Sequence, residues 1–116
     1  MQGPFFFFRS IVDLVVNRPA AGTYRLCEKD EQQQLIVRRV GRADTDLRVE
    51  LLKHTADQTR LVFFFEYAAG PWEAYTRECQ EYHEFRETLI NPKHPLPPEG
   101  STLRCPVKGC EYGGNP

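Results

Sequence analysis

The spacing of hydrophobic residues along the first ninety positions changes several times, and each change marks a predicted element. Between residues 5 and 17, apolar side chains recur three or four positions apart: Phe8, Ile11, Val12, Val15 and Val16. This spacing predicts a short amphipathic helix, which Pro19 ends because proline lacks a backbone donor and clashes with the preceding turn. The four phenylalanines at 5–8 also fit an extended segment.

The next three apolar segments predict strands. Residues 23–28, "TYRLCE", and residues 35–40, "LIVRRV", flank the polar connection "KDEQQQ" and predict an antiparallel hairpin. We expect Gly41 to end the second strand. Residues 61–67, "LVFFFEY", are strongly apolar and predict a third strand at the centre of a small sheet.

Two further helices are predicted. Residues 47–54 follow several potential N-caps in "RADTD" and place Leu47 and Leu51 on one face. Residues 72–85 form the longer helix, with Pro71 near its first turn, where proline is tolerated. The order of elements predicts an α+β fold with a small three-stranded antiparallel sheet flanked by helices.

The composition changes after this last helix. Residues 92–116 are rich in proline and glycine and almost empty of large apolar side chains. We therefore expect a domain over residues 1–91, beginning with the N-terminal helix, and a tail that something other than its own core attaches.

The overall composition is that of a globular domain. The 116 residues are 41% hydrophobic and 27% charged, and the net charge of −1 excludes a wholly basic coat protein while allowing a local basic patch. No apolar run approaches the roughly 18 residues of a membrane-spanning helix, and the N-terminus does not read as a signal peptide. We expect a cytoplasmic chain without a membrane partner, as a monomer or weak dimer, in which cysteines indicate metal binding or burial.

Cysteine and histidine spacing predicts a zinc site. Cys79 and His83 lie four residues apart on one face of the long helix, and Cys105 and Cys110 flank a turn containing proline and glycine. Two such pairs would complete a closed tetrahedral Cys₃His site. A structural zinc ion would also fix the tail, which lacks a core.

Alternatives exist for this group. His94 competes with His83 for the fourth position. Without a metal, Cys79 would be a small buried residue, His83 a surface side chain, and the two tail cysteines a thiol pair or disulfide. Cys27 falls within the first predicted strand, and we expect it in the core.

Four short motifs follow one another in a characteristic order: "GTY" at 22–24, "RVG" at 39–41 with "RADTDLRVELLKH" after it, "EAYTRECQ" on the last helix, and "LIN" at 89–91. In order and spacing they resemble the GIY-YIG nuclease superfamily, over Gly22 to Asn91. The tail resembles the ending of small stand-alone prokaryotic members, where a proline-rich stretch precedes a cysteine pair. The resemblance implies cleavage of nucleic acid, DNA more than RNA, with Mg²⁺ or Mn²⁺.

The resemblance also implies roles for individual residues. Tyr24 matches the first-motif tyrosine, which lines the site near the attacking water. Arg42 matches a phosphate-contacting cation, a role that suits guanidinium geometry. Glu78 matches the metal-binding glutamate. Arg48 matches an arginine of the shorter helix, next to the one that stabilises the transition state.

The chain departs from the family pattern at two positions. Arg39 stands where the family has the second-motif tyrosine, its general base or water-orienting group. Glu50 stands where the charge-stabilising arginine is expected, and Arg48, two positions earlier, points some 200° away around the helix. Losing one such charge-stabilising group commonly lowers the rate by about 10²–10³.

These departures leave three functions open. One is a divalent-metal-dependent endonuclease. A second is a degenerate member that binds nucleic acid without cutting it, through the basic residues Arg38, Arg39, Arg42 and Lys53. A third is a protein-interaction domain whose phenylalanine-rich N-terminus docks a partner.

Overall fold

The computed structural model describes residues 1–57, 61–90 and 92–112, so Asn91 and the last four residues of the predicted tail lie outside it. In chain order the elements are β1 (Gln2–Phe6), α1 (Arg9–Val15), β2 (Gly22–Lys29), β3 (Leu35–Ala43), α2 (Leu47–His54), the 3₁₀ turn η1 (Thr55–Asp57), β4 (Val62–Tyr67) and α3 (Pro71–Phe85). In the described part of the chain, no helix has the length and apolar character needed to cross a membrane.

The sheet is antiparallel with the strand order β1-β4-β2-β3. The prediction of α+β architecture is confirmed, but the expected three strands are wrong because β1 adds a fourth. The predicted helix over 5–17 begins only at Arg9, since the phenylalanines before it extend beside β4. Phe5 pairs with Phe63, and the Phe7 amide donates to the Leu61 carbonyl.

The hairpin and the two later helices are confirmed, with one correction. The second strand was expected to stop at Gly41, yet β3 continues to Ala43. Gly41 lies directly opposite Tyr24 in the ladder, and a Cβ atom added there would overlap the Tyr24 ring. This glycine therefore makes room for an aromatic ring and does not end the strand.

Local chemistry explains where α2 and α3 begin. The Asp46 carboxylate accepts a hydrogen bond from the Val49 amide, so it caps α2. Pro71 occupies the first turn of α3, where its missing N–H group would have no partner within the helix.

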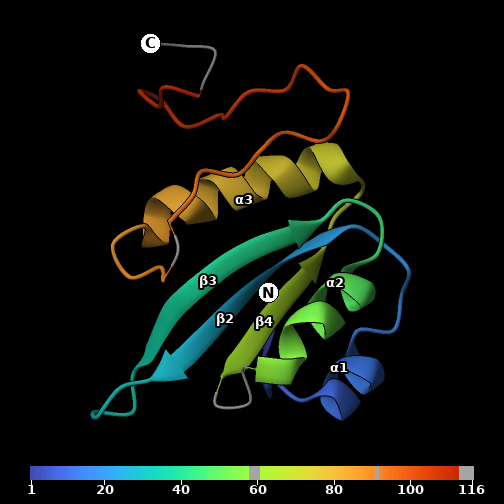
Figure 1. Cartoon of the computed structure of the whole chain (residues 1–116), viewed down its shortest axis with the longest axis vertical. Helices are drawn as coiled ribbons and strands as arrows, with labels where there is room; N and C mark the ends of the chain where they lie inside the picture. The colour runs from blue at the N-terminus through green and yellow to red at the C-terminus, as the bar shows by residue number, and fades with distance from the viewer. Residues whose placement is uncertain (58–60, 91, 113–116) are drawn as a thin grey trace.

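Helices cover both faces of the sheet. Figure 1 shows α1 and α2 on one side, α3 on the other, and most of the tail beyond α3. Phe7, Phe63, Phe65, Leu47 and Leu51 belong to the main core between the sheet and α1 with α2. Cys27 is buried in β2, as expected.

A second, smaller cluster joins α3 to the tail. Tyr75 and Cys79 of α3 pack against Cys105, with Leu103 and Val107 at the edge. The tail thus has few apolar contacts, in agreement with its composition.

Candidate functional site

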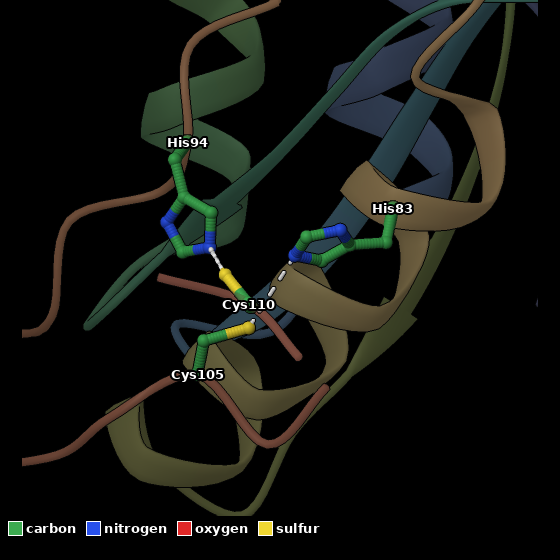
Figure 2. A group of neighbouring side chains, drawn as sticks. All are labelled: His83, His94, Cys105 and Cys110. Atoms are coloured by element: carbon green, nitrogen blue, oxygen red, sulfur yellow. Dashed lines mark hydrogen bonds between the residues drawn. The ribbon is translucent and has the colours of Figure 1, made fainter. Parts of the chain in front are cut away.

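Four side chains with nitrogen or sulfur donors meet between α3 and the tail. His83 comes from α3, while His94, Cys105 and Cys110 come from the tail, and their ligand atoms all lie within 4.8 Å of one another. Figure 2 shows the rings and sulfur atoms converging: Cys105 Sγ lies 3.5 Å from His83 Nε2, and Cys110 Sγ lies 3.3 Å from His94 Nε2.

This geometry fits a tetrahedral metal ion. Zinc bonds of about 2.3 Å to sulfur and about 2.0–2.1 Å to nitrogen give a sulfur-to-nitrogen edge of roughly 3.6 Å. His94 Nδ1 lies 2.8 Å from the Pro95 carbonyl oxygen. Because a carbonyl only accepts, Nδ1 carries a proton, and Nε2 is the ring nitrogen that faces the group. The Tyr112 amide donates to Cys110 Sγ at 3.4 Å.

Protonation in this group follows from burial. Burial lowers the pKa of His83, and the nearby His94 and Arg86 lower it further, so its imidazole is neutral and can act as a ligand. Burial raises the pKa of the Cys105 thiol. A metal ion that binds Cys105 must therefore displace a proton.

The group differs from the predicted zinc site by one member. His94, the competing ligand, takes part beside His83, whereas Cys79 is fully buried against Tyr75 and is not among the four. Cys79 and His83 share a helix face and both meet the tail, but the Cys79 thiol packs against Cys105 in the apolar cluster while the His83 imidazole joins the other three donor atoms. Cys105 and Cys110 are free thiols. This His₂Cys₂ group could bind a metal such as zinc.

A second site is a cleft of about 570 Å³ bounded by β3, α2 and α3. Tyr24 of β2, Arg42 of β3 and Glu78 of α3 all line it, so three of the four predicted catalytic residues lie together. Arg39 and Glu50, the two residues that depart from the family pattern, line the same cleft.

Arg42 bridges two carboxylates in this cleft. Its Nη1 donates to Glu78 Oε1 and its Nε donates to Asp44 Oδ1, each at 2.7 Å, and the Arg42 and Glu78 side chains are only 12% and 13% exposed. Burial favours a lower pKa for Arg42, but the hydrogen bonds to Asp44 and Glu78 outweigh it and raise the pKa. Burial raises the pKa of Glu78, and Arg42 offsets only part of this. Asp44 was not among the predicted residues.

Tyr24 contacts a histidine that the sequence analysis missed. Its hydroxyl lies 3.2 Å from His54 Nε2, and Glu50 Oε1 lies 3.6 Å from the same nitrogen. Burial, with Glu50 and Glu78 nearby, raises the pKa of Tyr24, so the phenol stays protonated at neutral pH. The hydrogen bond from His54 lowers the pKa of Glu50. The four-residue spacing of Glu50 and His54 on α2 could have indicated this pair.

The remaining predicted residues are divided between the cleft and its surroundings. Arg48 pairs with Asp13 of α1 at 2.8 Å and does not line the cleft. Arg38 binds Glu28 at 2.7 Å and donates to the Thr88 carbonyl. The position of Arg48 agrees with the helix geometry of the sequence: it points about 200° away from Glu50, which lines the cleft, and therefore away from the cleft.

Lys53 and Arg39 are the other two predicted nucleic-acid contacts, and both line the cleft. Lys53 pairs with Glu50 at 3.4 Å, whereas the buried Nε of Arg39 has no hydrogen-bond partner among the described residues. With Arg42, the lining of the cleft contains three cationic side chains. It also contains four carboxylates, Asp44, Asp46, Glu50 and Glu78, so the formal charge of the lining is −1.

Comparison of this chain with models of protein families, with curated proteins and with solved structures gave no match.

Proposed function

We propose that this chain is a GIY-YIG-like nuclease domain that hydrolyses phosphodiester bonds of nucleic acid with Mg²⁺ or Mn²⁺. One observation carries the proposal: Tyr24, Arg42 and Glu78 come from three different elements and line one cleft. Each of them stands at a position that matches a functional residue of the superfamily.

The residues present fit a hard divalent cation that keeps most of its water. Mg²⁺ binds through one or two carboxylates and several waters, and Glu78 offers one carboxylate in a cleft with room for water. Glu78 would hold the cation, and Arg42 would continue to bind Oε1. A bound cation supplies charge that neutralises a phosphate oxygen and the leaving group.

The side chains of the cleft orient water and accept its proton. The Tyr24 hydroxyl lies 3.2 Å from His54 Nε2. In the tautomer in which Nε2 accepts from the phenol, the oxygen lone pairs of Tyr24 are free to accept from the attacking water. His54 lies beside Glu50 and is placed to take up a proton that the water loses through Tyr24. Arg39 supplies a positive charge from the position where the family has a tyrosine.

The second candidate function is a degenerate nucleic-acid-binding domain. Two observations favour it: Arg42 is already neutralised by Asp44 and Glu78, and Glu50 adds a negative charge where an arginine is expected. Such a domain would bind nucleic acid in a salt-sensitive manner without turnover, because phosphate contacts release counterions.

A cleavage assay separates the two functions. We expect DNA or RNA to be cut with Mg²⁺ or Mn²⁺ by the wild type, and cleavage to be abolished in Glu78→Ala. Glu84→Ala is the matched control, because Glu84 is an exposed carboxylate on the same helix. A wild type that cuts neither nucleic acid with either metal would exclude the enzyme.

A restoration experiment addresses the degenerate alternative. The double variant Arg39→Tyr with Glu50→Arg rebuilds both family positions, and we expect it to raise the cleavage rate by at least about 10², the usual effect of one charge-stabilising group. A wild type that binds but does not cut, with a double variant that cuts, would establish a degenerate family member. Binding that does not respond to ionic strength would argue against both functions.

For the His₂Cys₂ group between α3 and the tail, the proposal is a structural zinc ion on His83, His94, Cys105 and Cys110. The donor set supports it, since two thiolates and two imidazoles complete a closed tetrahedral site. Protein purified without chelator should contain one zinc ion per chain, and Cys105→Ser should lose it. Substoichiometric zinc in the wild type would contradict the assignment.

Two further variants test the choice of ligand. His94→Ala should lose zinc, whereas Cys79→Ala should retain it, because Cys79 lies outside the group. The opposite result would restore the originally predicted Cys₃His set.

A further inference from the structure

Residues 93–96 of the tail connect the His₂Cys₂ group to the cleft. We call His83, His94, Cys105 and Cys110 the metal group. Lys93 and Pro95 line a small pocket of about 50 Å³ together with Arg39 and Glu78, and Leu96 lines the main cleft. Arg39 and Glu78 line both spaces, so the pocket and the cleft are neighbours. His94, a member of the metal group, lies within this segment.

The attachment of the tail depends on the metal group. Among the described residues, Cys105 Sγ lies 3.5 Å from His83 Nε2 and so joins residues 92–112 to α3. Beyond this contact, the tail contacts α3 through the small apolar cluster around Cys105 and through edge-on contacts of the His94 ring with Tyr82 and His83. The Tyr82 ring lies 5.2 Å from the rings of both His83 and His94. A metal ion bonded to all four ligands would therefore fix this segment beside the cleft.

The side chains of this segment suit a nucleic acid. Lys93 is exposed and, within the described residues, forms no ion pair, so it adds a free cation beside Arg39. Leu96 is 75% exposed and lines the cleft, so its side chain is available for an apolar contact there. A cation and an apolar side chain three residues apart match the phosphate backbone and the base or sugar surface of a single strand.

We propose that residues 93–96 form a second wall of the nucleic-acid site, held in place by the metal group. Lys93 contacts a backbone phosphate, and Leu96 contacts a base or sugar. This inference rests on the proposed action on nucleic acid, and it assigns the metal group a role in substrate binding beyond attachment of the tail.

Binding of a short fluorescein-labelled single-stranded DNA, followed by fluorescence anisotropy over a range of salt concentrations, tests the two contacts. Lys93→Ala should weaken binding and reduce the slope of log K against log salt concentration by about 1, because one phosphate contact is lost. Leu96→Ala should weaken binding with an unchanged slope, since an apolar contact releases no counterion.

Matched controls are available elsewhere on the surface. Lys29→Ala changes an exposed lysine at the far end of β2, and Leu14→Ala changes a leucine of α1 that is 70% exposed. Both controls should bind as the wild type does. If Lys93→Ala and Leu96→Ala also bind as the wild type while Arg39→Ala does not, the cleft binds DNA but residues 93–96 are not part of the site, and the inference is overturned.

Trypsin digestion tests the role of the metal independently of DNA. Zinc-loaded protein should resist cleavage after Lys93, and Cys105→Ser should be cut there at least tenfold faster and should bind the DNA at least tenfold more weakly. Equal cleavage of the two proteins would overturn the proposed anchoring. If zinc-loaded wild type binds no DNA, the proposed function fails and the DNA contacts fail with it, whereas the digestion still decides whether the metal holds this segment.

Discussion

Tyr24 owes its position to the residue opposite it in the sheet. Gly41 is its partner on β3, and no other residue leaves space for the ring at this point of the ladder. The phenol can therefore pass over Gly41 and reach His54 on α2. The glycine of the second motif thus has a physical function, which is to place the tyrosine of the first.

Gly41→Ala should displace the Tyr24 ring, because the added methyl group would occupy its volume. We expect the free energy of unfolding to fall by about 1–3 kcal/mol, as is typical of overpacking, and the Tyr24–His54 hydrogen bond to be lost. Urea denaturation would measure the first effect. Gly70→Ala is the control, since a Cβ at Gly70 meets no atom within 4 Å. Equal stability of Gly41→Ala and the wild type would contradict the account.

At the scale of elements, a buried ion pair joins α3 to the sheet. Arg25 Nη2 of β2 lies 2.6 Å from Glu81 Oε1, and the Arg25 guanidinium also lies over the Phe85 ring. Glu81 is only 5% exposed, and its second oxygen has no hydrogen-bond partner within the described residues. Burial therefore dominates and raises the pKa of Glu81, with only partial compensation from Arg25.

This raised pKa predicts a pH-dependent stability. The folded carboxyl holds its proton more tightly than the unfolded one, so above the ordinary value of 4.5 the folded state binds more protons and the free energy of unfolding falls as pH rises. Glu81→Gln removes this titration. We expect the wild type to lose stability relative to Glu81→Gln as pH rises from 4.5, in denaturant unfolding at several pH values.

Taking the difference between the two proteins cancels titrations that they share, including those of the metal group. Glu84→Gln on the exposed face of α3 is the control and should follow the wild type. Parallel stability curves for the wild type and Glu81→Gln would show that Arg25 fully compensates the burial of the carboxylate.

For the whole molecule, the main core does not include the tail. Among the described residues, the cluster around Phe63 and Phe65 ends at Tyr67, the last residue of β4. Removal of zinc should therefore release the tail while the sheet stays folded. Far-UV circular dichroism should change little, and the melting temperature should depend on zinc concentration, with a gain of about 2.7 kcal/mol at 100 times the dissociation constant. Cys105→Ser should show no such dependence.

The sequence predicted the elements whose structure is local. The β2–β3 hairpin, α2 and α3 follow from turns, caps and apolar spacing within short windows. By contrast, β1 depends on pairing with β4, nearly sixty residues away, and a run of phenylalanines fits either a helix or a strand.

The residues of the candidate site also divide into those that the sequence predicted and those that it did not. Tyr24, Arg42 and Glu78 were predicted through motif order, and they meet in one cleft. His54 was missed because its contact with Tyr24 joins residues thirty positions apart, whereas Asp44 pairs with Arg42 only two residues away and carried no motif signal. The choice of His94 over Cys79 depends on the path of the tail, which a sequence without regular elements does not specify.

The pairing of β1 with β4 also has a consequence for folding. β1 is synthesised well before β4, its partner strand, which is complete only at Tyr67. During translation the phenylalanines at 5–8 therefore have no strand to cover them, and exposed apolar segments of this kind promote aggregation. Because contacts distant in sequence form slowly, we expect the β2–β3 hairpin to form early and the closure of β1 onto β4 to complete the sheet.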